Sequence, residues 1–277
     1  MLTEHSEELI EHYSEHLLRG SGYSGEGFAA GYDSYRPSPP AALLDILCVE
    51  AQVERPRLVV DLGSGTGLST RAWADRAEEV VGVEASPEMC AQAEATTSLG
   101  NVRFIQAYAQ ETGLPADVAD VVTCSQSFHW MEPEPTLAEA ARILRPGGVF
   151  AAYDYDWPPV VHWEVEAAFE ELLLRVGRLR SGPRGRIRYS KEGHLERMRA
   201  SGHFRQAREV VLHSRERGSA ERIVGMAMSL GPMVVLLQEG TSEEEIGLAA
   251  LREAAALALG EREVEMFLGY RVRLGIR

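Results

Sequence analysis

The feature of this sequence that most restricts its fold is an apolar strand that runs directly into a glycine-rich loop. The segment from Val59 to Ser69 reads VVDLGSGTGLS, with glycines at Gly63, Gly65 and Gly67. Glycine accepts the backbone conformations of a tight turn and lets a ligand approach the main chain closely. A buried strand, a glycine turn and a following helix together are typical of nucleotide-binding α/β proteins.

Short apolar segments and helical segments alternate on both sides of this loop. The pattern predicts helices at 2–19, 40–50, 69–77, 87–95 and 135–144, and strands at 58–62, 80–83, 102–105, 120–124 and 148–153. Apolar strands that alternate with helices indicate a parallel sheet covered on both faces. We therefore expect an α/β protein with a Rossmann-like, doubly wound, mostly parallel seven-stranded sheet and a helical lid or insertion.

The later part of the chain has a different pattern. It predicts a helix at 163–176, a strand at 206–213, two helices at 219–230 and 242–259, and a final strand in FLGYRVRLGIR. The expected organisation is an N-terminal helix and closing segment at 1–40, the sheet core at 41–214, a helical lid insertion at 215–265 and the last sheet strand at 266–277.

Composition excludes several classes of function. The chain has 28 Lys and Arg against 42 Asp and Glu, a formal net charge of −14, which opposes binding to nucleic acid or to an anionic membrane surface. The N-terminal segment is polar, and no apolar run reaches the roughly 18 residues of a membrane span. Three cysteines without a C-x-x-C pair indicate reduced thiols. We therefore expect a cytoplasmic protein without nucleic-acid or membrane partners.

Two acidic residues distinguish this loop from that of a dinucleotide-binding protein. Glu84 ends the second predicted strand, where a carboxylate can accept hydrogen bonds from both ribose hydroxyls. The dinucleotide fingerprint is G-x-G-x-x-G, but here the third glycine comes one residue early. Asp61 precedes the first glycine by two residues. An acid there favours a cationic ligand, such as an amine or a sulfonium, over a pyrophosphate.

Four segments resemble the class I S-adenosylmethionine-dependent methyltransferases. The glycine loop with its acid is the first, and GLPADVADVVTCSQSFHWM and LAEAARILRPGGVFAAYDY resemble the segments around the family's fourth and fifth strands. GYDSYRPSPP resembles the entry of the trans-aconitate methyltransferase-like small-molecule subgroup. The resemblance spans roughly residues 28–155. It implies S-adenosyl-L-methionine as cofactor, a small-molecule acceptor, no metal, and a monomer or homodimer.

The resemblance also implies a set of cofactor-binding residues. Gly63, Gly65 and Gly67 would lie beside the methionine part and the ribose of the cofactor, and Glu84 would bind the ribose hydroxyls. Asp61 would either order the glycine turn or bind the amino group. The other residues implied to contact the cofactor are Tyr32, Arg36, which would pair with its carboxylate, Ser64, Ala85, Met89, Ala109, Gln110, Ser125 and Gln126.

On the acceptor side, the resemblance implies His129 as a catalytic base or orienting group, and Tyr35 and Trp130 as parts of the substrate pocket. The alternative is a structural His129, with Tyr35 packed on the first helix and Arg36 in solvent. The expected reaction is O-methylation of a carboxylate or hydroxyl. C- or N-methylation, nucleotide-dependent oxidation and non-catalytic binding of an S-adenosyl ligand are the alternatives.

Three further patterns have open interpretations. Seven basic residues between Arg175 and Lys191 would either attract a carboxylate substrate or lie in a solvated, ion-paired loop. His12 and His16 have the i, i+4 spacing of a metal pair, but without further ligands we expect a solvated helix face. The methionines and the apolar run at 226–237 would either line an acceptor pocket or pack between helices.

Overall fold

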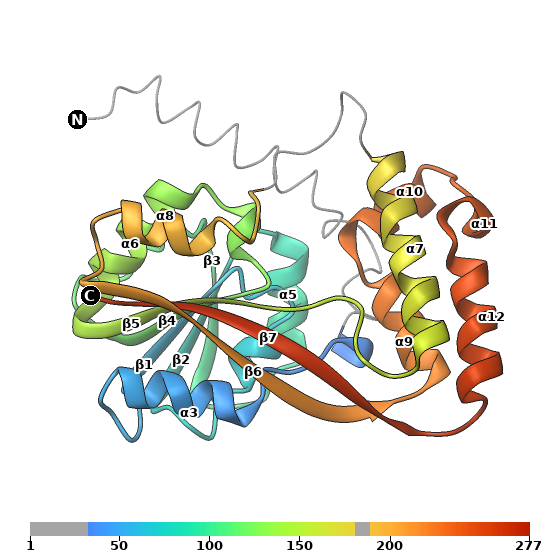
Figure 1. Cartoon of the computed structure of the whole chain (residues 1–277). Helices are drawn as coiled ribbons and strands as arrows, with labels where there is room; N and C mark the ends of the chain where they lie inside the picture. The colour runs from blue at the N-terminus through green and yellow to red at the C-terminus, as the bar shows by residue number, and fades with distance from the viewer. Residues whose placement is uncertain (1–32, 181–188) are drawn as a thin grey trace.

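The computed structural model describes residues 33–180 and 189–277, and its centre is one seven-stranded sheet (Figure 1). The strand order is β3-β2-β1-β4-β5-β7-β6. β7 is antiparallel to both of its neighbours, and the other paired strands are parallel. The strands are β1 (Leu58–Leu62), β2 (Glu79–Glu84), β3 (Val102–Gln106), β4 (Ala119–Ser125), β5 (Leu144–Tyr155), β6 (Gln206–Gly218) and β7 (Val264–Ile276). The predicted fold class is confirmed.

Helices connect and cover these strands. They are α3 (Ala41–Glu50), α4 (Leu68–Arg71), α5 (Pro87–Ala95), α6 (Pro133–Ile143), α7 (Trp163–Leu179), α8 (His194–Ala200), α9 (Ala220–Met228), α10 (Gly231–Gln238), α11 (Glu243–Ile246) and α12 (Leu248–Leu259). The predicted helix at 2–19, the pair His12 and His16, and Tyr32 lie outside the described residues.

Two helical predictions were wrong in extent. The helix predicted at 69–77 is only the single turn α4, followed by further turns. The two helices predicted between 219 and 259 are four. Pro232, which has no N–H to donate, stands in the first turn of α10, and Gly247 with φ +90° separates α11 from α12.

Alternating strand residues divide the core between the two faces of the sheet. Val59 and Val121 belong to the cluster that includes α3, whereas Val60 and Val122 belong to the cluster that includes α6 and α8. This follows from the two-residue period of a strand, which sends successive side chains to opposite faces. A parallel sheet buried on both sides explains why these strands are continuous apolar runs.

The helical layer at one end of the molecule is joined to the sheet by a long two-stranded ribbon. β6 and β7 pair from Gln206 opposite Ile276 to Gly218 opposite Val264, and Figure 1 shows them reaching α9 and α12. The expected boundary between 214 and 215 therefore falls inside β6. The boundary at 265/266 falls inside β7 in the same way. In both cases strand pairing continues past the predicted end of the sheet.

The helical layer is not one continuous insertion. α7, which precedes β6, packs against α12, and its Phe169 lies in the same core cluster as Met226 and Met233 of α9 and α10. Both methionines are fully buried there and pack between helices rather than lining an acceptor pocket. The layer is therefore assembled from two parts of the chain, because α7 buries its apolar face on helices that come after β6.

No single helix within residues 33–180 and 189–277 has the length and hydropathy to cross a membrane. α9 and α10 meet those criteria only as a pair, with a bend of 75° between them.

Replacement of Gly225 tests the contact between α9 and the segment before α3. A Cβ at Gly225 would lie 2.3 Å from Cγ of Tyr35, so Gly225→Ala must displace the ring. We expect it to lower the free energy of unfolding by about 1–3 kcal/mol, although alanine favours helices. Gly177→Ala in α7 is the matched control, because its Cβ would meet nothing within 4 Å, and it should raise stability by roughly 0.5–1 kcal/mol. Urea unfolding of both variants would measure this, and equal effects would contradict the packing described.

Candidate functional site

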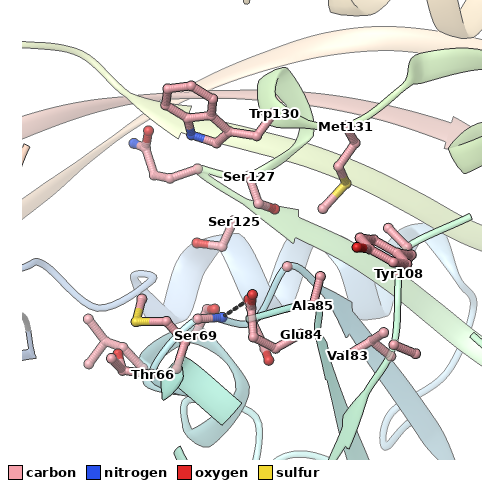
Figure 2. A pocket seen from close by; sticks show the side chains of 18 of the residues that line it. Thr66, Ser69, Val83, Glu84, Ala85, Tyr108, Ser125, Ser127, Trp130 and Met131 are labelled. Carbon is pink, nitrogen blue, oxygen red and sulfur yellow. Dashed lines mark hydrogen bonds between the residues drawn. The ribbon is translucent and has the colours of Figure 1, made fainter. Parts of the chain in front are cut away.

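A deep cleft opens at the carboxyl ends of the central strands, the edge where parallel α/β sheets bind ligands. It encloses about 1170 Å³ of empty space, including its open mouth. Figure 2 shows side chains from the ends of several strands converging on it. Its lining is Arg36, Pro37, Pro39, Gly63, Ser64, Gly65, Thr66, Leu68, Ser69, Val83, Glu84, Ala85, Met89, Ala107, Tyr108, Ala109, Gln110, Ser125, Gln126, Ser127, Trp130, Met131, Glu132 and Tyr155.

The glycine turn forms part of the cleft wall. The amides of Gly63 and Ser64 both donate to the Val83 carbonyl, at 2.8 and 3.1 Å, which fixes the turn to the end of β2. Gly63 has φ +67°, and a Cβ there would lie 2.6 Å from Cε of Met131 and 2.7 Å from Cβ of Ser127. This position therefore requires glycine both for its backbone conformation and for the close packing of the loop after β4.

Glu84 is held with both carboxylate oxygens on main-chain donors. Oε2 accepts from the Gly65 amide and Oε1 from the Ser86 amide, each at 2.8 Å, and Figure 2 draws the first bond. Burial raises the pKa of Glu84, while these amides act in the opposite direction. A carboxylate has about four acceptor sites, so Glu84 retains acceptor capacity beyond these main-chain donors. The residue can therefore accept hydrogen bonds from the hydroxyls of a ligand at the cleft.

Asp61 does not line the cleft, so its side chain is not placed to contact a ligand bound there. Its carboxylate is completely buried and accepts from Ser69 Oγ at 2.6 Å, Thr70 Oγ1 at 2.8 Å and Thr123 Oγ1 at 2.7 Å. Burial raises its pKa, and the hydroxyl donors lower it. Of the two predicted roles, the geometry favours ordering of the glycine turn, because these donors come from α4 and β4.

Four of the predicted cofactor-binding residues, which follow β2 and β3, lie on the cleft. Ala85 and Met89 follow β2, and Ala109 and Gln110 follow β3; all four are lining residues. Tyr108, which the sequence analysis did not select, also lines the cleft (Figure 2). Its position just after β3 is a usable signal, because the parallel strands of this sheet send their following loops to the same edge.

The opposite side of the cleft is formed by the ends of β4 and β5 and by Arg36. Arg36 is 6% exposed; its Nε donates to Ser229 Oγ at 2.7 Å and its Nη1 to Tyr155 Oη at 2.6 Å. The alternative of a solvated Arg36 is therefore wrong. Gln126, Trp130 and Tyr155 line the same side.

Two predicted acceptor-side residues lie away from the cleft. Tyr35 packs its ring over Gly225 of α9, and its hydroxyl donates to Glu221 at 3.4 Å. His129 is 4% exposed and is not a lining residue; its Nδ1 lies 3.7 Å from Asp154 Oδ1. The loop after β4 turns inward at His129, so the histidine packs beneath the wall to which its neighbour Trp130 belongs.

Gly67 also lies outside the cleft lining. It has φ +86° and stands at the start of α4, where a Cβ would lie 2.6 Å from the Phe104 ring. Its role in this structure is to let the helix start close to Phe104 of β3. Ser64, in contrast, lies on the cleft as predicted.

Several lining residues were missed by the sequence analysis. Tyr155 ends β5 and carries the same strand-end signal as Tyr108. Pro37, Met131 and Glu132 have no comparable signal, because only the path of their loops brings them to the cleft. Glu132 is half-buried, and that burial raises the pKa of its carboxyl group.

The described ends of the basic stretch at 175–191 are paired with acids. Arg175 Nε lies 2.9 Å from Glu171 Oε1, and Lys191 Nζ lies 2.7 Å from Asp154 Oδ1. Neither basic residue is part of the cleft lining. At these two positions the structure shows ion pairing, while residues 181–188 lie outside the described part.

Comparison with known proteins finds similarity mainly in the sheet part of the chain. A model of a methyltransferase domain matches residues 60–152. An uncharacterized methyltransferase of Mycobacterium tuberculosis is 37% identical over 123 residues, covering 44% of this chain and 48% of the relative. A probable S-adenosylmethionine-dependent methyltransferase of Saccharomyces cerevisiae is 30% identical over 147 residues, covering 51% and 50%. The chain therefore spans about half the length of the curated relatives it matches.

Solved structures extend the likeness beyond this domain. One from Anaeromyxobacter dehalogenans, provisionally assigned as a type II methyltransferase, has a TM-score of 0.69 and 25% identity, covering 87% of this chain and 98% of its own. The YcgJ protein of Bacillus subtilis has a TM-score of 0.54 at 20% identity, covering 86% and 99%, and shows the shared fold. Membership of the trans-aconitate subgroup stays a prediction. The matched domain, residues 60–152, contains the glycine turn, Glu84 and the loop after β4, so these parts of the cleft lie in the region that is similar to a methyltransferase domain.

Proposed function

We propose that this protein transfers a methyl group from S-adenosyl-L-methionine to an oxygen of a small-molecule acceptor, a carboxylate or a hydroxyl. The observation that carries the proposal is Glu84, a carboxylate at the cleft whose oxygens are both oriented by main-chain amides. That arrangement suits a ribose with two free hydroxyls. It also fits the match of residues 60–152 to a methyltransferase domain.

The residues of the cleft fit the proposed cofactor. Gly63 and Gly65 have positive φ angles, which favour glycine, and because glycine has no side chain the turn leaves space beside Glu84. Ala85, Met89 and Ala109 offer a largely apolar surface for a base.

The chemistry requires alignment more than activation. When bound, S-adenosyl-L-methionine supplies a sulfonium methyl group, and an oxygen–carbon bond forms in line as the carbon–sulfur bond breaks. The protein's own contribution is to hold both reactants and to exclude water. Trp130, Met131 and the prolines Pro37 and Pro39 supply apolar wall for that purpose.

Two charged residues of the cleft lining can interact with the acceptor. Arg36 can offer N–H groups to a carboxylate, and a carboxylate acceptor needs no base. A hydroxyl acceptor would need one, and Glu132, with its raised pKa, is better placed than His129 because it lines the cleft. Methylation of nitrogen or carbon and NAD(P)-dependent oxidation are the competing functions, and the short glycine spacing opposes the last.

Calorimetric titration with S-adenosylhomocysteine tests the cofactor assignment. We expect the wild type to bind and Glu84→Ala to lose affinity on the order of 100-fold, because two hydrogen bonds to a charged acceptor are removed. Glu79→Ala is the matched control at the other end of β2, where Glu79 pairs with Arg103 on the surface, and it should bind like the wild type. Binding of NAD(P) in place of S-adenosylhomocysteine would refute the proposed function.

The pH dependence of that binding should report Glu84. The ionised form is the one that accepts from both ribose hydroxyls, and burial raises its pKa above the ordinary value of about 4.3. Affinity for S-adenosylhomocysteine should therefore fall as pH decreases through this raised pKa, earlier than an exposed glutamate would allow. Glu84→Gln should bind more weakly and lose this dependence. A Gln variant with the wild-type pH profile would assign the effect to another group.

Asp61→Asn separates support of the turn from ligand contact. An amide has one acceptor oxygen for the three hydroxyls that Asp61 now receives, so we expect the free energy of unfolding to fall by about 1–3 kcal/mol, with weaker binding of S-adenosylhomocysteine. Asp75→Asn, an exposed neighbour, should change neither. Thermal or urea unfolding with parallel titration measures both. If Asp61→Asn lost S-adenosylhomocysteine binding at an unchanged free energy of unfolding, Asp61 would instead be a residue that contacts the ligand.

A further inference from the structure

A charged cluster around Asp154 adjoins the acceptor side of the cleft, because Asp154 immediately precedes the lining residue Tyr155 in β5. Lys191 Nζ lies 2.7 Å from Asp154 Oδ1, and Arg273 Nη1 of β7 donates to Asp154 Oδ2 at 3.2 Å. Arg273 Nε also lies 2.8 Å from Glu209 Oε2 of β6. The Asp154 and Arg273 side chains are 7% and 5% exposed. The cluster joins the last three strands of the sheet order to the segment before α8.

Lys191 connects this cluster to the cleft through Gln126. Its Nζ donates to Gln126 Oε1 at 2.7 Å, and Gln126 is a lining residue just past the end of β4. Gln126 has φ +55°, an uncommon conformation for a residue other than glycine, so its side chain starts from a constrained backbone. Two independent features, the backbone and the lysine, therefore fix where this amide lies.

The chemistry of Lys191 decides which way the amide points. An ammonium group has donors only, so the amide atom that faces it must be the oxygen. The Nε2 group then lies on the other side, where one N–H reaches the Tyr155 carbonyl at 3.5 Å. Within the described residues the structure gives the second N–H no partner. Arg36 donates to the hydroxyl of Tyr155. The guanidinium of Arg36 and the amide of Gln126 therefore both contact Tyr155.

We propose that Lys191, held by Asp154, is a positioning residue that presents the Gln126 amide N–H to a carboxylate bound in the cleft. The inference rests on the proposed function. The carboxylate has two possible sources, the amino-acid part of the cofactor and an acceptor acid. Both need the same donor, and a glutamine that was free to flip would offer its oxygen instead and repel either.

NMR of the glutamine side-chain amide measures the orientation directly. Protein labelled with [¹⁵N]glutamine shows the Gln126 amide as the signal lost in Gln126→Leu. Lys191→Met should move that signal, and Lys191→Arg should largely restore it, since arginine also only donates. Arg199→Met is the matched control, because Arg199 of α8 is an exposed cation paired with Glu196. A Gln126 signal that moves no more in Lys191→Met than in this control would overturn the proposal.

Three probes distinguish the source of the carboxylate. S-adenosylhomocysteine carries the amino-acid carboxylate, 5′-methylthioadenosine lacks it, and propionate is a free carboxylate. If the cofactor is the source, S-adenosylhomocysteine shifts the Gln126 signal and methylthioadenosine does not. If the acceptor is the source, propionate shifts the signal of the S-adenosylhomocysteine complex, while sodium chloride does not. In either case Lys191→Met should lower the affinity for the probe that shifts the signal, on the order of tenfold.

The outcomes separate this inference from the proposed function. No binding of S-adenosylhomocysteine by the wild type would refute the proposed function. Binding without a response of the Gln126 signal to any carboxylate would refute the inference alone. If Lys191→Met does not fold, Gln126→Glu takes its place, because it keeps the contact with Lys191 and removes the donor. Unchanged affinity for the carboxylate probes in Gln126→Glu would equally overturn the proposal.

Discussion

The cleft depends on one buried carboxylate that is not part of its surface. Asp61 is the second-last residue of β1, just before the glycine turn, and it accepts hydrogen bonds from the hydroxyls of Ser69, Thr70 and Thr123. A charge without water is costly unless such donors surround it, so these elements must keep their relative positions. The turn above can then be held at the end of β2 by the Val83 carbonyl, and Glu84 lies where its carboxylate is needed.

The helical layer contributes to the cleft through a polar connection at Arg36. Ser229, at the end of α9, receives Arg36, and Arg36 in turn donates to Tyr155 at the end of β5. Three distant parts of the chain therefore meet at the acceptor side. Because the core of the layer continues through the β6–β7 ribbon into the core of the sheet, the position of Arg36 is fixed by packing on both sides.

Much of the site could be predicted because parallel α/β sheets place their ligands by rule. Glu84 ends a strand, and Ala85, Gln110 and Gln126 follow one. The shared direction of those strands brings all four to one edge. His129 was misplaced by the same reasoning, since a loop after a strand can also turn its side chain inward. Tyr35 was misplaced because its partner is Gly225, a residue 190 positions later whose missing side chain leaves no signal of its own.

By itself the sequence determined the sheet, the glycine turn and the acid at the end of β2, because these follow from local periodicity and backbone conformation. Only the tertiary structure decided which polar residues face the cleft and which support it. Asp61 and Glu84 are both acids at strand ends, yet one is enclosed by hydroxyls and the other is open to a ligand. The orientation of the Gln126 amide is likewise set by Lys191, which lies 65 residues further along the chain. Such contacts depend on chain segments that meet only after folding, and local sequence patterns carry no record of them.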